Sequence, residues 1–212
     1  AADQGKLDLD DKMVSFFPDR TIANLDARKE AITVRHLVSM TSGLQCVRDG
    51  MEGDTTLEMH RSPDYVQFAL DLPAAYEPGS QFIYCSPAIS LLSPILQQAT
   101  GMTTLAFARQ YLFEPLGIHD VLWETDPQGY YAGHGDLSLH PHDMAKLGLL
   151  FLQEGQWEDK QIISRRWVKE ARIAQSETPG EENAYGYGWW LAPDLEGVYR
   201  AEGRNGQYIY IL

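Results

Sequence analysis

The chain has 212 residues, of which 44% are hydrophobic and 22% charged, enough for the core of one good-sized domain or two small lobes. Its formal net charge of −13 disfavours nucleic acid and anionic membrane as partners, because both are negatively charged. No apolar run approaches the length of a membrane span.

The first residues predict small elements joined by loops. "AADQG" is typical of the tail of a helix that ends at Gly5, and residues 6–31 alternate short polar and apolar patches around Pro18. The chain starts without Met or a signal peptide, and its last residues, "GQYIYIL", stop in the middle of a strand pattern. We therefore expect a fragment of a longer protein, truncated at both ends.

Helix signals begin at Thr33, which is a suitable N-cap for a short helix that ends before Gly43. Residues 45–62 carry glycines and many charges, so they are predicted to form a loop or lid. Ser62 and Pro63 predict the start of a helix that runs to about Leu72.

The stretch "QFIYCSPAIS" (81–90) predicts a helix start with Ser86 as N-cap and Pro87 at the first helical position. Apolar residues then recur at spacings of one, three and four until Gly101, which is typical of a buried helical face. Tyr84 is not needed by this helix, so its phenol is either packing or chemistry.

Further helices are predicted at 103–117, from Pro141 to about Gly155 with His140 as an unusual N-cap, and after Ser164. Residues 119–138 are predicted to be rich in loops, and the tail from about 185 alternates like antiparallel strands. The order predicts an α+β fold. We expect one domain over 1–212, with a helical lobe at about 33–175 and a sheet segment at about 185–212.

Metal and disulfide chemistry find little support in the spacing of the cysteines and histidines. Cys46 and Cys85 are too few for a disulfide framework and are predicted to be buried free thiols, with a disulfide as the alternative. A metal site at His134, His140 and His142 is considered but not adopted, because no carboxylate–histidine constellation accompanies them.

Seven segments then occur in an order that is specific when taken together: "GKLDLDD", "ITVRHLVSMTSGL", "YEPGSQFIYCSPAISLLSPIL", "TGMTTLAFARQYLFEPLGI", "GDLSLHPHDMAKLGLLFLQEGQW", "YGYGWW" and "GRNGQYIYIL". Over essentially all 212 residues the chain resembles the serine β-lactamase-related family. That family includes class C β-lactamases, D,D-peptidases, D-aminopeptidases and carboxylesterases, and the resemblance implies a β-lactamase/transpeptidase-like fold.

The resemblance implies roles for residues of two motifs. Tyr84-Cys85-Ser86 corresponds to the family's Tyr-x-Asn motif, whose tyrosine relays the proton of the nucleophilic serine, and Ser86 stands where Asn is frequent. Arg204-Asn205-Gly206 corresponds to the Lys/His-x-Gly strand motif, and the N–H of Gln207 would be one donor of the oxyanion hole.

Two departures and two alternatives accompany this assignment. Arg204 replaces the usual Lys or His, and none of the serines has Lys three residues later, so the family's nucleophile motif Ser-x-x-Lys is absent. Tyr84 taken alone is a half-buried packing aromatic, and Asn205-Gly206 taken alone is a hairpin turn.

The resulting hypothesis is a serine acyl-transfer hydrolase acting on an ester, amide or β-lactam through an acyl-enzyme, with this chain inactive alone because it lacks the nucleophile. A non-catalytic binding or scaffold protein with the same fold is the alternative. We expect no cofactor, no metal and no nucleic acid, and a small-molecule or peptide-like acyl substrate. The family implies a periplasmic or extracellular location, and the sequence leaves the oligomeric state open.

Overall fold

A computed structural model of the chain describes residues 1–48, 53–178, 184–192, 195 and 197–212. These residues form two compact units. Unit 1 holds Ala1–Thr104 and Glu124–His134, and unit 2 holds Leu105–Trp123 and Gly135–Leu212. The chain therefore leaves unit 1 once, returns to it for a short segment and leaves it again.

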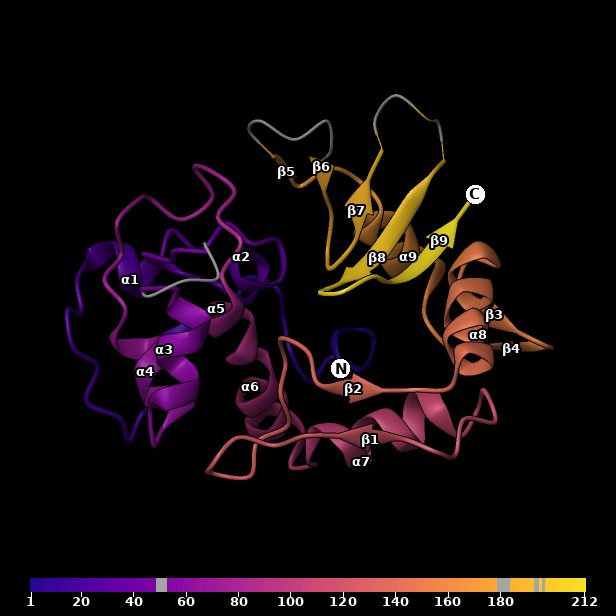
Figure 1. Cartoon of the computed structure of the whole chain (residues 1–212), viewed down its shortest axis with the longest axis horizontal. Helices are drawn as coiled ribbons and strands as arrows, with labels where there is room; N and C mark the ends of the chain where they lie inside the picture. Colours follow the sequence, from indigo (N-terminus) through magenta and orange to yellow (C-terminus); the bar gives the residue numbers. More distant parts are fainter. Residues whose placement is uncertain (49–52, 179–183, 193–194, 196) are drawn as a thin grey trace. The chain divides into compact units, whose positions relative to one another are not determined.

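Unit 1 consists of short helices and the segments between them (Figure 1). They are the 3₁₀ helices η1 (Ala2–Gln4) and η2 (Met13–Phe16) and the α-helices α1 (Ala27–Ala31), α2 (Val34–Val38), α3 (Thr55–Arg61), α4 (Tyr65–Asp71), α5 (Ser86–Ser90) and α6 (Leu92–Thr100). Their apolar faces meet in one core, with Leu37, Leu70, Leu91 and Ile95 fully buried at its centre.

Side-chain caps fix where several of these helices start. Thr33 caps α2 as predicted, while Asp54 caps α3, which lies inside the predicted loop or lid at 45–62. Residues 49–52 of that stretch lie outside the described residues. The predicted start of α4 at Ser62 was wrong, because the side chain of Asp64 accepts the N–H of Gln67 and caps the helix.

The helix predicted from Pro87 to Gly101 is two helices, α5 and α6, divided at Leu91. Pro94 explains the break, because it has no N–H to donate in the middle of a helix. A new helix beginning at Leu92 places Pro94 in its first turn, where that donor is not needed. Gly101 ends α6 in the left-handed conformation, as predicted.

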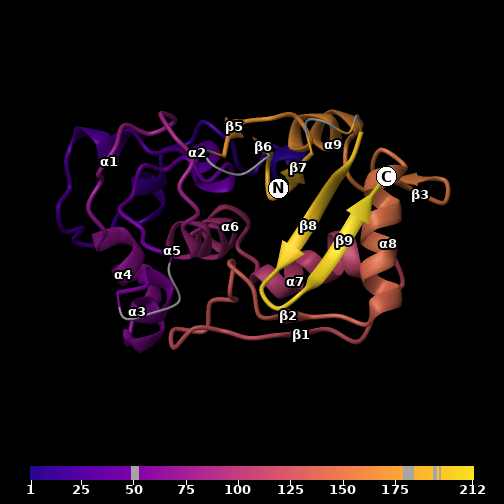
Figure 2. The ribbon, with the colours of Figure 1, turned by 45° about the horizontal axis from the view of Figure 1, so that its top comes forward.

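In its described residues, unit 2 combines helices with three antiparallel sheets (Figures 1 and 2). The helices are α7 (Thr104–Ala108), which starts at the unit boundary, the π-helix η3 (Arg109–Phe113), α8 (Pro141–Leu152) and α9 (Arg165–Ala171). Two small sheets pair β1 (Leu122–Trp123) with β2 (Leu137–Ser138) and β3 (Gln156–Trp157) with β4 (Lys160–Gln161). The largest sheet runs in chain order through β5 (Ser176–Glu177), β6 (Ala184–Tyr185), β7 (Trp190–Leu191), β8 (Tyr199–Gly203) and β9 (Gln207–Ile211).

Helix α8 packs against β9, and a glycine makes the close approach possible (Figure 2). A Cβ on Gly148 would lie 2.9 Å from Cγ2 of Ile209. Trp189 and Trp190 are buried in aromatic contacts with Tyr199 and Tyr185, respectively. Helices with antiparallel sheets confirm the α+β class.

Two further predictions are settled by the described residues. His140 and Ser164 are the N-caps of α8 and α9, as expected. None of the described helices is long and apolar enough to cross a membrane.

Candidate functional site

The predicted site residues fall into two groups, one in each unit. Tyr84 and Ser86 lie in unit 1, at the start of α5, and residues 204–207 lie in unit 2, at the turn between β8 and β9. The structure therefore brings residues together within each group.

In unit 1, backbone hydrogen bonds join the motif "SMTSGL" (39–44) to the motif "YEPGSQFIYCS" (76–86). Gly43 is central to this contact, because its carbonyl accepts the N–H groups of Ala75 and Tyr76 at 2.9 and 3.1 Å. Its φ is +75°, and a Cβ there would lie 2.3 Å from the carbonyl oxygen of Tyr76. Only glycine fits this position without rearrangement.

Met40 accepts hydrogen bonds from the residues before and after Tyr84. Its carbonyl accepts the N–H of Ile83 at 2.8 Å, and its sulfur accepts the N–H of Cys85 at 3.5 Å. Met40 itself has a φ of +58°, in the left-handed region that side-chain-bearing residues enter at a cost. Such a conformation persists where the surroundings determine it, and here it directs two acceptors at the neighbours of one tyrosine.

A disulfide adds a covalent anchor beside Tyr84. Cys46 and Cys85 are bonded, so the prediction of free thiols was wrong and the alternative was right. Their separation of 39 residues hid the pairing, because only the contact between the two motifs brings Cys46 next to Cys85. Closing a loop of this size by a disulfide typically stabilises a protein by roughly 2–4 kcal/mol.

Tyr84 is half-buried, and its ring carries a cation on one face. The guanidinium carbon of Arg48 lies 4.3 Å from the ring centroid, a cation–π contact. Sequence reasoning missed Arg48. No spacing rule connects the two residues; the disulfide at Cys46 places Arg48 there.

Ser86 does not have the capping role that was predicted for it. It is the first residue of α5, Cys85 is the N-cap, and no side-chain cap bond is found at this helix start among the described residues. The carbonyl of Ser86 accepts the hydroxyl proton of Ser90 at 2.8 Å. The hydroxyl of Ser86 is therefore not committed to starting the helix.

His36 lies close to the motif at 76–86 that carries Tyr84. Thr33 and His36 form a reciprocal capping box at the start of α2: the N–H of Thr33 donates to Nδ1 of His36 at 3.1 Å, and the N–H of His36 to Oγ1 of Thr33 at 3.4 Å. Burial, and to a smaller extent Lys12 and Arg35, lower the pKa of His36 from its usual 6.5. The neutral imidazole is also the form that can accept the Thr33 N–H.

In unit 2, residues 204–206 form the exposed turn between β8 and β9, and Gln207 is the first residue of β9. Gly203 pairs with Gln207, and Asn205 and Gly206 have φ values of +73° and +96°. Asn and Gly adopt such values at low cost, so the turn alternative for these residues is correct. The turn leaves the side chains of Arg204 and Asn205 in solvent, available to a ligand.

The histidines considered for a metal lie in different units. His134 belongs to unit 1, whereas His140 and His142 belong to unit 2, where His140 is 3.8 Å from a carboxylate oxygen of Asp120. Within the described ranges, no three or more His, Cys, Asp or Glu side chains are arranged to hold a metal ion.

Comparisons with known proteins identify the family of the chain. The β-lactamase family model matches residues 1–212. The chain is 30% identical over 121 residues to penicillin-binding protein 4 of Amycolatopsis lactamdurans, which covers 55% of this chain and 30% of that protein. It is 25% identical over 141 residues to 6-aminohexanoate-dimer hydrolase of Paenarthrobacter ureafaciens, covering 62% and 36%.

A solved structure, the putative 6-aminohexanoate-dimer hydrolase from Bacillus anthracis, superposes with a TM-score of 0.83 at 19% identity. The match covers 99% of this chain and 59% of that one, and at this identity it shows the fold alone. The alignments to the two curated relatives span about a third of their length.

Proposed function

This chain belongs to the β-lactamase family, and from that premise we propose that it provides part of the active site of a serine acyl-transfer hydrolase. The reaction would cleave an ester, amide or β-lactam bond through an acyl-enzyme. The observation that carries the proposal is the restraint on Tyr84. Its neighbours Ile83 and Cys85 donate hydrogen bonds to Met40, Cys85 is held by the disulfide, and Arg48 lies over the ring. A group that transfers protons must be held in place in this way.

In the proposed mechanism, a serine oxygen attacks the carbonyl carbon of the substrate. The serine proton passes through Tyr84 to the leaving group as the acyl-enzyme forms, and water then hydrolyses that ester. The backbone N–H of Gln207 stabilises the oxyanion, Gly206 lets the substrate approach the strand, and Arg204 attracts an acidic substrate group.

Residues 1–212 contain no Ser-x-x-Lys motif, so they do not supply the nucleophile of this mechanism in the family's usual form. We therefore propose that this chain alone is inactive. Ser86 is the residue to exclude first, because it follows Tyr84 closely and no longer has a capping role.

The names of the relatives favour acyl substrates of small-molecule or peptide-like size. One is a penicillin-binding protein and another a hydrolase of 6-aminohexanoate dimer. We extend this substrate class to the present chain as part of the proposal. The disulfide supports the proposed periplasmic or extracellular location, since disulfides persist in oxidising compartments.

The second candidate is a binding or scaffold protein that retains the fold without catalysis. The missing Ser-x-x-Lys favours it. Reading the gene upstream of the codon for Ala1 separates the two: an in-frame Ser-x-x-Lys supports the hydrolase, and its absence supports the binding protein.

The activity test uses purified protein with p-nitrophenyl esters, nitrocefin and a fluorophosphonate label. The 212-residue chain should neither turn over substrate nor be labelled, whereas the product of a gene containing Ser-x-x-Lys should do both. Turnover by the 212-residue chain that Ser86→Ala abolishes would make Ser86 the nucleophile and overturn the proposed inactivity.

A further inference from the structure

Unit 1 contains a pair of histidines that sequence spacing did not reveal. His60 is the exposed histidine in the last turn of α3, and His134 ends the segment that returns to unit 1. Their Nε2 atoms are 3.2 Å apart and their ring centroids 5.3 Å apart. Two imidazole nitrogens from distant parts of the chain thus face each other at the surface.

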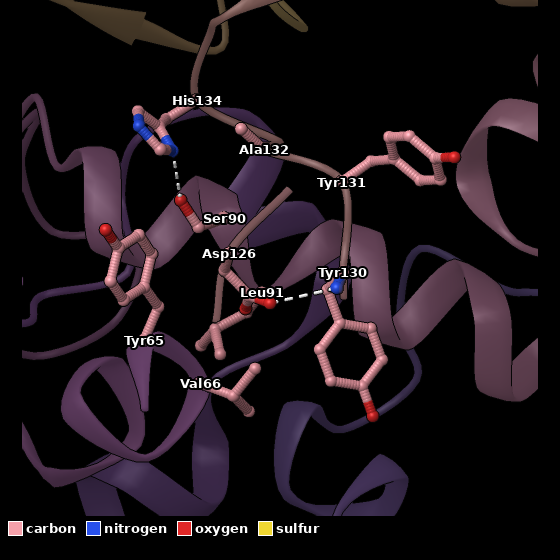
Figure 3. A pocket seen from close by; sticks show the side chains of 9 residues that line it. All are labelled: Tyr65, Val66, Ser90, Leu91, Asp126, Tyr130, Tyr131, Ala132 and His134. Atoms are coloured by element: carbon pink, nitrogen blue, oxygen red, sulfur yellow. Dashed lines mark hydrogen bonds between the residues drawn. The ribbon is translucent and has the colours of Figure 1, made fainter. Parts of the chain in front are cut away.

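Ser90 determines which nitrogen of His134 carries a proton. The single hydroxyl proton of Ser90 goes to the carbonyl of Ser86 at 2.8 Å, so Ser90 Oγ accepts from His134 Nδ1 at 2.7 Å (Figure 3). A neutral imidazole with its proton on Nδ1 has its lone pair on Nε2. His134 therefore directs a basic nitrogen at His60, and the Nε2–H of His60 donates to it.

This arrangement is the one that a metal-binding histidine requires. Such a histidine gives its other N–H to an oxygen, which fixes the tautomer and the direction of the ring. Ser90 does this for His134, and Tyr65 restrains His60, with its hydroxyl 3.4 Å from the His60 carbonyl and its ring centroid 5.6 Å from the imidazole.

The distance between the nitrogens also suits a metal ion. Two metal–nitrogen bonds of about 2.1 Å span 3.2 Å when the angle between them is about 100°, between the octahedral and tetrahedral values. The ion would lie off the line between the nitrogens, so each lone pair would turn by about 40°. The broad χ2 preference of histidine permits such a turn.

We propose that His60 and His134 bind one divalent transition metal ion of the class that prefers imidazole: Cu²⁺, Ni²⁺ or Zn²⁺. The ion takes the place of the proton between the two Nε2 atoms, and His60 changes tautomer: its Nε2 proton leaves to solvent while its Nδ1 takes one up. Water completes the coordination, because the described residues supply two ligands rather than a closed set of three or more. Mg²⁺ and Ca²⁺ are excluded by their preference for oxygen ligands.

The bound ion would tie the returning segment to α3. His134 of the returning segment also lines a small pocket with Tyr65, Ser90 and Asp126 among others, where burial raises the pKa of Asp126 (Figure 3). A metal bridge at its rim would hold residues 124–134 in place and give the chain a metal-dependent melting temperature. This inference does not depend on the proposed hydrolase activity.

Titration calorimetry of the 212-residue chain with CuCl₂, NiCl₂ and ZnCl₂ tests the proposal. We expect one site per chain, tightest for Cu²⁺, and a Cu²⁺ EPR spectrum with two nitrogen ligands. His60→Gln and His134→Gln should each abolish that spectrum. Ser90→Ala should weaken binding by about tenfold to a hundredfold, as expected when the residue that orients a ligand is lost.

The matched control is His142→Gln, which removes an exposed histidine of unit 2 and should leave affinity and spectrum unchanged. Circular dichroism of each variant establishes that it is folded. Absence of binding to the wild-type chain would overturn the proposal, as would binding that survives either His60→Gln or His134→Gln.

Discussion

Met40, Tyr84 and Arg48 act at the scale of single residues, and their arrangement depends on contacts rather than on neighbours in sequence. Met40 accepts from both sides of Tyr84, and Arg48 covers one face of its ring. The ring is thus fixed by packing and charge, while its hydroxyl is the group with a proposed chemical role. A substitution that removes only the hydroxyl separates the two contributions.

We predict that Tyr84→Phe lowers kcat by about 10²–10⁴, the usual range for a lost acid–base group, in a protein that joins these residues to a nucleophilic serine. The melting temperature should change little, since phenylalanine keeps the ring that contacts Arg48. Steady-state kinetics and thermal melting measure the two quantities.

A kcat within a few-fold of wild type would end the proton-relay assignment. A stability loss of roughly 1–3 kcal/mol with normal kcat would instead identify a structural hydrogen bond of the phenol.

The close contact between Gly43 and the backbone of Tyr76 leads to a second prediction at the scale of single residues. Gly43→Ala should destabilise the chain by roughly 2–4 kcal/mol, because alanine adds both a left-handed backbone cost and a clash 2.3 Å from the Tyr76 carbonyl. Gly101→Ala is the matched control: Gly101 has a φ of +71°, but nothing lies within 4 Å of its added Cβ. It should cost about 1–2 kcal/mol. Equal losses in urea unfolding would show that the close approach is unimportant.

At the scale of elements, the capping box of α2 links stability to pH. The pKa of His36 is lowered in the folded state, so protonation costs the folded chain more than the unfolded one. The contribution of neutral His36 is complete above its usual pKa of 6.5 and is lost as pH falls through the lowered value.

The variant His36→Gln tests this pH dependence of stability, because glutamine at the same position can still complete a capping box and does not titrate. We expect the free energy of unfolding of the variant to be within about 1 kcal/mol of the wild-type value at pH 8. The wild-type chain should then lose more stability than the variant between pH 7 and pH 5 in urea unfolding. Parallel pH profiles would contradict the prediction, and His142→Gln, outside the box, should follow the wild-type profile.

Helix starts show what local sequence could and could not predict. Thr33 and Ser164 were identified correctly because an N-cap side chain acts within three residues. His140 was identified through Pro141 at the first helical position, since its own side chain makes no capping bond. The division of α5 from α6 was missed, although Pro94 carried the signal. Apolar periodicity continues through the break, because both helices face the same core.

At the scale of the whole molecule, the fold class and family could be predicted because they rest on the order of many segments. The disulfide, Arg48 over Tyr84, and the His60–His134 pair could not. Each joins residues that are distant in sequence, and only the folded backbone defines their distance. The proposed roles of Tyr84 and Gln207 remain predictions.

The path of the chain through its two units also orders events during synthesis. The first part of unit 1 is complete once Thr104 has been synthesised. Its last segment, Glu124–His134, is complete 30 residues later (134 − 104 = 30). At ribosomal speed this delay lasts about 2–6 seconds. Until then the core of unit 1 lacks Tyr130, and Ser90 lacks its imidazole partner. The nascent chain thus offers chaperones an apolar surface that closes only when translation has passed His134.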